Sequence, residues 1–126
     1  MSTVAPEEIA VAWIEKWSLP EGERTFEHPG NALDWELPRS DPNLCLAAIL
    51  AVLVRIPVDP ANEHFQVLAA GPMEDLLKNH GAALLPEIEK LARQRPAFRQ
   101  LLGGVWQSSI NPHVWEAVTR FRGQRW

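Results

Sequence analysis

The sequence of 126 residues contains one cysteine and no tyrosine. One thiol cannot form a disulfide within the chain, and Cys45 lies in the apolar segment 44–50, which predicts a buried side chain. The longest unbroken apolar run, 44–54, has 11 residues and is too short to cross a bilayer. The N-terminal segment has Glu7 and Glu8 but no early lysine or arginine, unlike a secretory signal. We therefore expect a cytoplasmic protein with no membrane attachment.

The sequence also lacks the motifs of common catalytic and cofactor sites. It has no G-x-S-x-G, no G-x-x-x-x-G-K-[ST], no G-x-G-x-x-G, no H-E-x-x-H and no cysteine pair. His113 and Glu116 have i, i+3 spacing, but two ligands do not make a metal site, and we interpret them as a surface pair. We expect no catalytic residue, no metal and no cofactor.

Charge is divided unevenly along the chain, although the net charge is only −4. Residues 1–63 carry a net charge of −7, and residues 64–126 carry +3. Most such charge is solvated surface, but an acidic half also attracts a basic partner. The basic end, 119–126, has three arginines, which is a small footprint for phosphates in an acidic chain, so nucleic-acid binding is not expected.

The chain has eleven prolines, and their positions favour helices. Proline is tolerated at the first helical position, where its missing N–H would have no partner anyway. Four prolines follow a residue type that caps helix N-termini, in the pairs Asp41-Pro42, Asp59-Pro60, Gly71-Pro72 and Asn111-Pro112. Apolar residues at three- and four-residue spacing follow each pair. The sequence therefore predicts an all-α protein.

The expected fold has six or seven short helices in antiparallel hairpins, similar to a helical-hairpin array, around one buried central helix. The central helix is 42–56, because it is apolar nearly all round. We expect a single domain, 1–126, with an N-terminal helix (1–18), an irregular acidic loop (19–40) that has one short turn near 33–37, a helical core (41–122) and a basic tail (123–126). The other core helices are expected at 60–70, 72–80, 83–94, 96–106 and 112–122.

The segment 68–81 predicts a corner between two helices. Gly71 would be the N-cap and Pro72 the first helical residue. Glu74 would then reach back to the N-cap N–H, and Asp75 would lie at the positive end of the helix dipole. Both carboxylates therefore have a structural explanation.

An enzyme is the rival interpretation of these carboxylates. It requires the fold to bring His64 or His80 close to Glu74 and Asp75. Neighbouring carboxylates do not by themselves create the shared-proton geometry of an acid–base pair, so we favour the helix corner.

Six tryptophans are an unusual share of the aromatic residues. Most of them lie on predicted apolar stripes and should pack in the core, namely Trp13, Trp17, Trp106 and Trp115. Trp35 and Trp126 have no obvious stripe. Exposed tryptophans often anchor a partner, but we favour a role in covering the helical core.

The segment 68–81 also resembles a family signature. Its residues match the pattern L-A-x-G-P-x-E-D-L-L-x-x-H-G, which is similar to an uncharacterised family of small bacterial helical proteins. The resemblance covers about 42–121 and includes Ile88-Glu89, Pro96-Ala97-Phe98, Leu101-Leu102 and Val105-Trp106. It implies a bacterial, helical, cytoplasmic protein and transfers no activity. Some small proteins of this kind resemble immunity proteins or antitoxins.

Taken with the missing catalytic motifs, these features favour a non-enzymatic protein-binding module, in particular an immunity protein or antitoxin that neutralises a basic toxin. Its binding surface is expected in the acidic half, at Glu21, Glu23, Glu27, Asp34, Trp35 and Glu36. An apolar anchor inside an acidic field suits a basic partner. The alternative is a structural or regulatory protein that forms a homodimer through Trp13 or Trp126.

Overall fold

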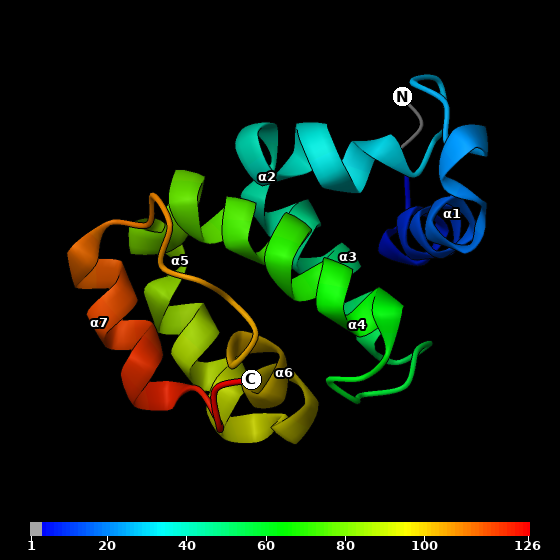
Figure 1. Ribbon diagram of the computed structural model, residues 1–126. Coiled ribbons are helices and arrows are strands. Elements are labelled where there is room, and N and C mark those ends of the chain that lie inside the picture. Colours follow the sequence, from blue (N-terminus) through cyan, green and yellow to red (C-terminus); the bar gives the residue numbers. More distant parts are fainter. Residues whose placement is uncertain (1–3) are drawn as a thin grey trace.

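The computed structural model describes residues 4–126, and every regular element in that range is helical, which confirms the all-α prediction (Figure 1). The α-helices are α1 (Pro6–Ser18), α2 (Leu37–Ser40), α3 (Pro42–Leu53), α4 (Glu63–Leu68), α5 (Glu74–Gln94), α6 (Pro96–Leu102) and α7 (Pro112–Phe121). A 3-10 turn, η1 (Glu21–Glu23), and two π-helical turns, η2 (Ala32–Glu36) and η3 (Ala69–Met73), complete the set. The predicted helix start at 1–3 lies outside the described residues, and within them α1 begins at Pro6.

Several helices begin at the predicted prolines. The Asp41 side chain accepts the N–H of Leu44 at the start of α3, and the Asn111 side chain accepts the N–H of His113 at the start of α7. Pro60 is an exception, because Asp59 forms a local turn with Ala61 instead. Asn62 caps α4 in its place, which explains why this helix begins three residues later than predicted.

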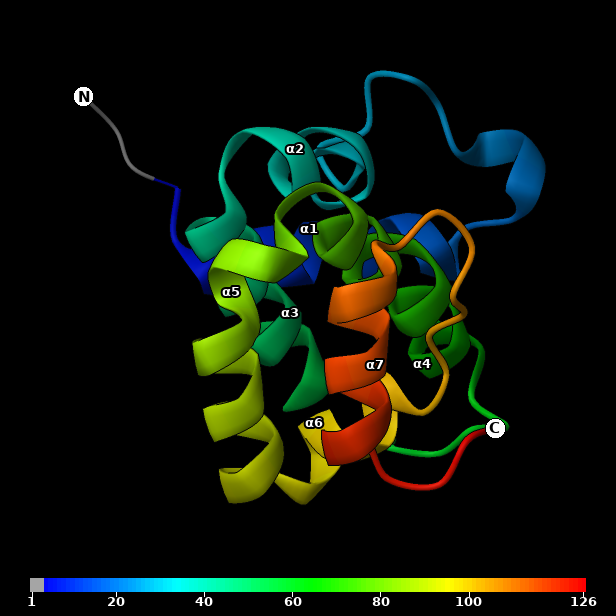
Figure 2. The same ribbon diagram turned by 90° about the vertical axis from the view of Figure 1, so that its left-hand side faces the viewer.

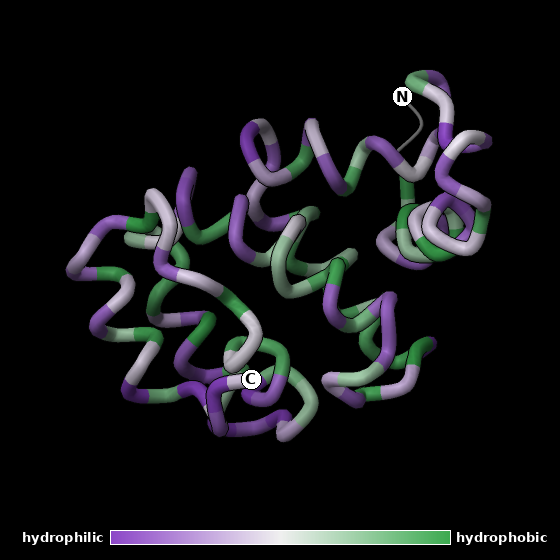
Figure 3. Tube along the Cα trace, in the orientation of Figure 1, coloured by the Kyte–Doolittle hydropathy of each residue, from purple (hydrophilic) through white to green (hydrophobic). Residues whose placement is uncertain are grey.

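Helix α3 occupies the centre of the molecule, as its apolar sequence predicts. It lies between α1 and α5 and contacts both (Figures 1 and 2). Its Cys45, Ala48, Ile49 and Val52 side chains are fully buried. Figure 3 shows this apolar helix in the interior, with hydrophilic segments mostly toward the outside. Burial of this surface is the main force that holds the other helices in place.

The predicted corner at Gly71 and Pro72 is wrong. Helix α4, the π turn η3 and α5 follow one another without a break from Glu63 to Gln94, so the predicted helices 72–80 and 83–94 form the single helix α5. In an α-helix the ring of Pro72 would clash with the carbonyl four residues earlier. A π turn hydrogen-bonds over five residues instead, and this wider turn accommodates the proline without ending the helix.

The predicted irregular loop, 19–40, is helical in its second half, where η2 and α2 follow one another. The basic tail, 123–126, packs against the helical core, and the N–H of Trp126 donates to the carbonyl of Gly103. The ring of Trp126 stacks on Phe65 with centroids 5.2 Å apart, and its indole N–H donates to the carbonyl of Gln100. Trp126 therefore covers the core, as favoured from the sequence, whereas the same role favoured for Trp35 is wrong, because that side chain is exposed. Trp13 is buried as predicted, whereas Trp106 is 65% exposed and does not belong to the core.

Gly81 lies inside α5 and does not end a helix. Its role is to let α5 and α7 approach closely, because a β-carbon at this position would lie 2.7 Å from Cγ1 of Val114. Helices α5 and α7 lie side by side in both ribbon views (Figures 1 and 2).

We expect Gly81→Ala to lower the free energy of unfolding by about 1–2 kcal/mol, because overpacking against Val114 outweighs the better helix propensity of alanine. Gly71→Ala is the matched control, since a β-carbon there meets only Oδ1 of Asp34 at 3.8 Å. This control should raise the free energy of unfolding by about 0.5–1 kcal/mol. Urea denaturation measures both, and a stabilised Gly81→Ala variant would contradict the close-approach explanation.

Candidate functional site

A cavity of about 580 Å³ opens where α1, the segment 21–26 and the two π turns meet. Three aromatic side chains line it, Trp17, Phe26 and Trp35, and we call it the aromatic cavity. Its polar lining residues are Lys16, Glu21, Arg24, Thr25, Asn31, Asp34 and Asp75. Its volume lies within the range of small-ligand and side-chain pockets, about 300–1,000 Å³.

Asp34 is the centre of the polar network beneath this cavity. Its carboxylate accepts three bonds, from Nε1 of Trp13 at 2.9 Å, from Nζ of Lys16 at 2.5 Å and from Nε1 of Trp17 at 3.0 Å. The side chains of Lys16 and Asp34 are only 6% and 8% exposed. A buried ion pair contributes little net stability unless its remaining hydrogen-bonding groups are satisfied, and the two indole N–H groups help to satisfy Asp34. The network therefore fixes α1 to η2 in one arrangement.

The two π turns provide the backbone of the site. Turn η2 carries Asp34 inward and Trp35 outward, and it contacts η3. Gly71, in η3, has no side chain, so the space beside the carboxylate of Asp34 stays open. Single π-helical turns inside helices occur frequently at functional sites, and here two of them meet at one cavity.

Two exposed aromatic rings form the rim of the aromatic cavity. Phe26 is 88% exposed and Trp35 is 48% exposed, and their ring centroids lie 6.0 Å apart at 40°. The Lys16 ammonium lies 5.1 Å from the centroid of Trp35 and 5.0 Å from that of Trp17. The Arg24 guanidinium lies 4.5 Å from the centroid of Trp17. These cation–π contacts hold the indole rings in place from one side.

The structure separates the predicted partner-binding residues into two groups. Glu21, Glu23, Glu27, Trp35 and Glu36 are exposed, as a binding surface requires. Asp34 is a correction: it is buried and neutralised by Lys16, so it supports the surface from below and adds little negative charge to it.

Phe26 and Lys16 are the site residues that the sequence interpretation missed. An isolated phenylalanine in the polar segment 24–28 is the same signal that drew attention to Trp35. Lys16 lies on the stripe of Trp13 and Trp17, at i+3 from the first, and a charged residue on an apolar stripe signals a buried partner.

No side-chain hydrogen bond joins the residues of the enzyme alternative to one another in the described part of the chain. Oε1 of Glu74 accepts the backbone N–H of Trp106 at 3.1 Å, so its predicted bond to the N–H of Gly71 is absent. Nε2 of His64 lies 3.2 Å from Oγ of Ser18, and Nε2 of His80 lies 2.7 Å from the carbonyl oxygen of Arg39. Of these side chains, only Asp75 lines the aromatic cavity.

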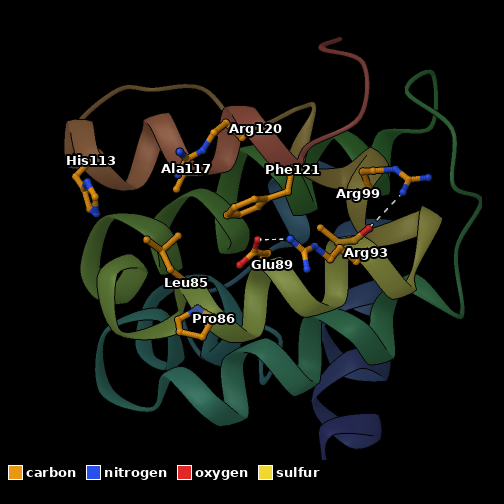
Figure 4. A pocket seen from close by; sticks show the side chains of 10 residues that line it. Leu85, Pro86, Glu89, Arg93, Arg99, His113, Ala117, Arg120 and Phe121 are labelled. Atoms are coloured by element: carbon orange, nitrogen blue, oxygen red, sulfur yellow. Dashed lines mark hydrogen bonds and ion pairs between the residues drawn. The ribbon is translucent and has the colours of Figure 1, made fainter.

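A second cavity, of about 710 Å³, lies between α5, α6 and α7 (Figure 4). Arg93, Arg99, Arg120 and His113 line it above an apolar floor that includes Phe121, and Arg93 pairs with Glu89 at 2.8 Å. His113 lines this cavity but Glu116 does not, so the two residues of the predicted surface pair do not share a pocket. Across residues 4–126, no group of three histidine, cysteine, aspartate or glutamate side chains is placed to hold a metal ion.

No helix within the described range combines the length and the apolar character that a membrane crossing needs.

Fold and site together define a small all-α protein with an aromatic-rimmed cavity over a buried ion pair. Residues 26–126 match the model of a family of unknown function, DUF6869, and the chain belongs to this family. The matched range begins at Phe26 and includes Asp34 and Trp35, while Lys16 and the rest of α1 lie before it. No curated protein and no solved structure matches the chain.

Proposed function

We propose that this chain is a non-enzymatic protein-binding module that recognises a basic partner through the exposed face around Phe26 and Trp35. The observation that carries the proposal is the exposed aromatic pair, in which the ring of Trp35 also contacts the Lys16 ammonium of the buried network. Aromatic side chains with few rotatable bonds are frequent energetic centres of interfaces.

Charge favours a basic partner. Glu21, Glu23, Glu27 and Glu36 are exposed in the same segment as the two rings, and only Arg24 is an exposed or half-exposed cation between residues 21 and 36. Such a field accelerates the encounter with a positively charged surface and disfavours acidic partners.

The particular role that we propose is a bacterial immunity protein or antitoxin that occludes a basic toxin in the cytoplasm. Occlusion of a toxin needs a complementary surface and no reactive group. Consistent with this role, Glu74, His64 and His80 each have a separate hydrogen-bond partner.

Affinity capture with the full chain as bait tests the proposal. We expect the wild type to retain one basic protein, and Phe26→Ala/Trp35→Ala to weaken that complex at least about 30-fold, the effect of losing two interface anchors. Trp106→Ala is the control, because Trp106 is also exposed but does not line the aromatic cavity, and this change should have no effect. Replacing Glu21, Glu23 and Glu27 by lysine should slow association and reverse its dependence on salt, because salt then screens a repulsion.

The homodimer alternative gives a different result in the same experiment. A self-association that persists in high salt, with no captured partner and no effect of the Phe26/Trp35 change, would contradict the proposal.

A further inference from the structure

The aromatic cavity contains hydrogen-bond acceptors that lack donors. Asn31 is 6% exposed, and its Nδ2 donates to the carbonyl of Thr25 at 2.9 Å, which fixes the orientation of the amide. Its Oδ1 is buried and has no hydrogen-bond partner in the described part of the chain. This oxygen has almost no accessible surface, so it lies within the wall of the cavity, and a ligand in the open space reaches the carboxylates that line it instead.

Asp75 provides an acceptor of this kind on the wall of the cavity. Its carboxylate is half-buried and forms no ion pair or hydrogen bond with the residues that the structure describes, since only its backbone carbonyl is used, by Asn79. Glu21 also lines the cavity and is exposed at its rim.

The two cations of the cavity are already engaged. Lys16 binds Asp34, and Arg24 donates its Nε–H to the carbonyl of Leu19 while it stacks on Trp17. Neither reaches the orphan oxygen of Asn31 or the carboxylate of Asp75 at hydrogen-bond distance. A ligand with several N–H donors and a positive charge would supply what this cavity lacks.

We infer that the aromatic cavity receives an arginine side chain of the basic partner, an inference that rests on the proposed protein-binding role. The guanidinium donates to Asp75 and to Glu21 at the rim, and its flat face stacks against the ring of Trp35. Its fork of five N–H groups can serve two separate acceptors and an aromatic face at once, which the compact ammonium of lysine does less well. Val67 and Ala70 offer an apolar wall for the methylene stem.

The test is an NMR titration of the folded chain with N-acetyl-arginine N-methylamide, observed through the tryptophan indole N–H signals. We expect saturable shifts of the Trp17 and Trp35 signals, and none for Trp126, which packs elsewhere on Phe65. The citrulline analogue has nearly the same shape without the charge, and it should bind at least about tenfold more weakly. The lysine analogue should fall between them. Equal binding of the citrulline analogue, or no shift with the arginine compound, would overturn the inference.

Two variants and a control connect the binding to the named acceptors. Asp75→Asn removes the charge without changing the shape, and we expect it to weaken binding of the arginine compound about tenfold. Glu21→Gln, at the exposed rim, cannot disturb the core and should weaken binding by about two- to threefold. Glu89→Gln, in the other cavity, is the control and should change nothing. Unchanged binding by both Asp75→Asn and Glu21→Gln would refute the assignment.

The titration and the capture experiment can each refute one proposal without the other. Capture that depends on Trp35 without any arginine binding would preserve the protein-binding role and refute the arginine site. Arginine binding without capture of a protein would refute the protein-binding role and identify the cavity as a site for a free guanidinium compound.

Discussion

Lys16→Met should lower the free energy of unfolding by about 3–5 kcal/mol, the largest effect that we expect from a single substitution. Methionine fills nearly the same volume, but it leaves the Asp34 carboxylate buried with no opposite charge. The two indole N–H groups that remain on Asp34 do not replace a full positive charge. Urea denaturation followed by circular dichroism measures the loss.

The double variant Lys16→Met/Asp34→Asn provides the control for this result. The single amide oxygen of asparagine still accepts one of the two indole N–H groups, and no charge remains buried, so the double variant should recover part of the lost stability. Breaking the exposed pair between Arg93 and Glu89 should cost less than about 1 kcal/mol. If Lys16→Met costs no more than that exposed pair, the buried network is not what joins α1 to η2.

Above pH 9 the protein should lose stability through Cys45. Burial of the thiol, followed by the negative charges of Asp75 and Asp41, raises its pKa from 9.0 to about 12. The folded state therefore keeps a proton that the unfolded state releases. The resulting stabilisation is complete below pH 9 and is lost as the pH rises toward 12, by about 1.4 kcal/mol per pH unit.

Denaturation of wild type and Cys45→Ala at a series of pH values from 8 to 11 measures this effect. The alanine variant should be less stable near pH 8, because it loses the packing of the buried sulfur. The difference between the two proteins should then shrink as the pH rises. The chain has no tyrosine, so no phenol ionises in the same range. A difference that stays constant with pH would show that the pKa of Cys45 is not raised.

Local signals allowed much of the fold to be predicted. A cap and its helix lie within four residues of each other, so Asp41 and Asn111 identify the starts of α3 and α7 without any knowledge of the rest of the chain. The continuous apolar composition of 44–53 likewise identifies the central helix, because only a helix surrounded by others can bury all its sides.

The errors arise where distant contacts override local preference. Gly-Pro normally ends a helix, but at Gly71 the packing of α3, η2 and α6 against η3 keeps the chain helical. Trp106 was predicted on a buried stripe, yet α6 ends at Leu102, and the following glycines make room for the ring of Trp126. The change of direction after Leu102 leaves Trp106 outside.

The candidate site was only partly predictable for the same reason. The acidic composition of the segment around Trp35 indicated that its glutamates form a surface, because exposure of a polar segment is a local property. The pairing of Lys16 with Asp34 joins residues 18 positions apart, and no periodicity specifies such a contact. The orphan acceptor on Asn31 is visible only when the whole fold is known.

The π turn at Ala69–Met73 also makes this segment sensitive to the insertion or deletion of a residue. A π turn holds one more residue than an α-helical turn between the same hydrogen-bonded ends, and each residue rotates an α-helix by about 100°. Deletion of Pro72 would allow an ordinary α-helix here and rotate all of α5 about its axis relative to α4. Leu76 and Leu77 would leave the core, and Gly81 would no longer face Val114. This segment can therefore vary in composition more readily than in length.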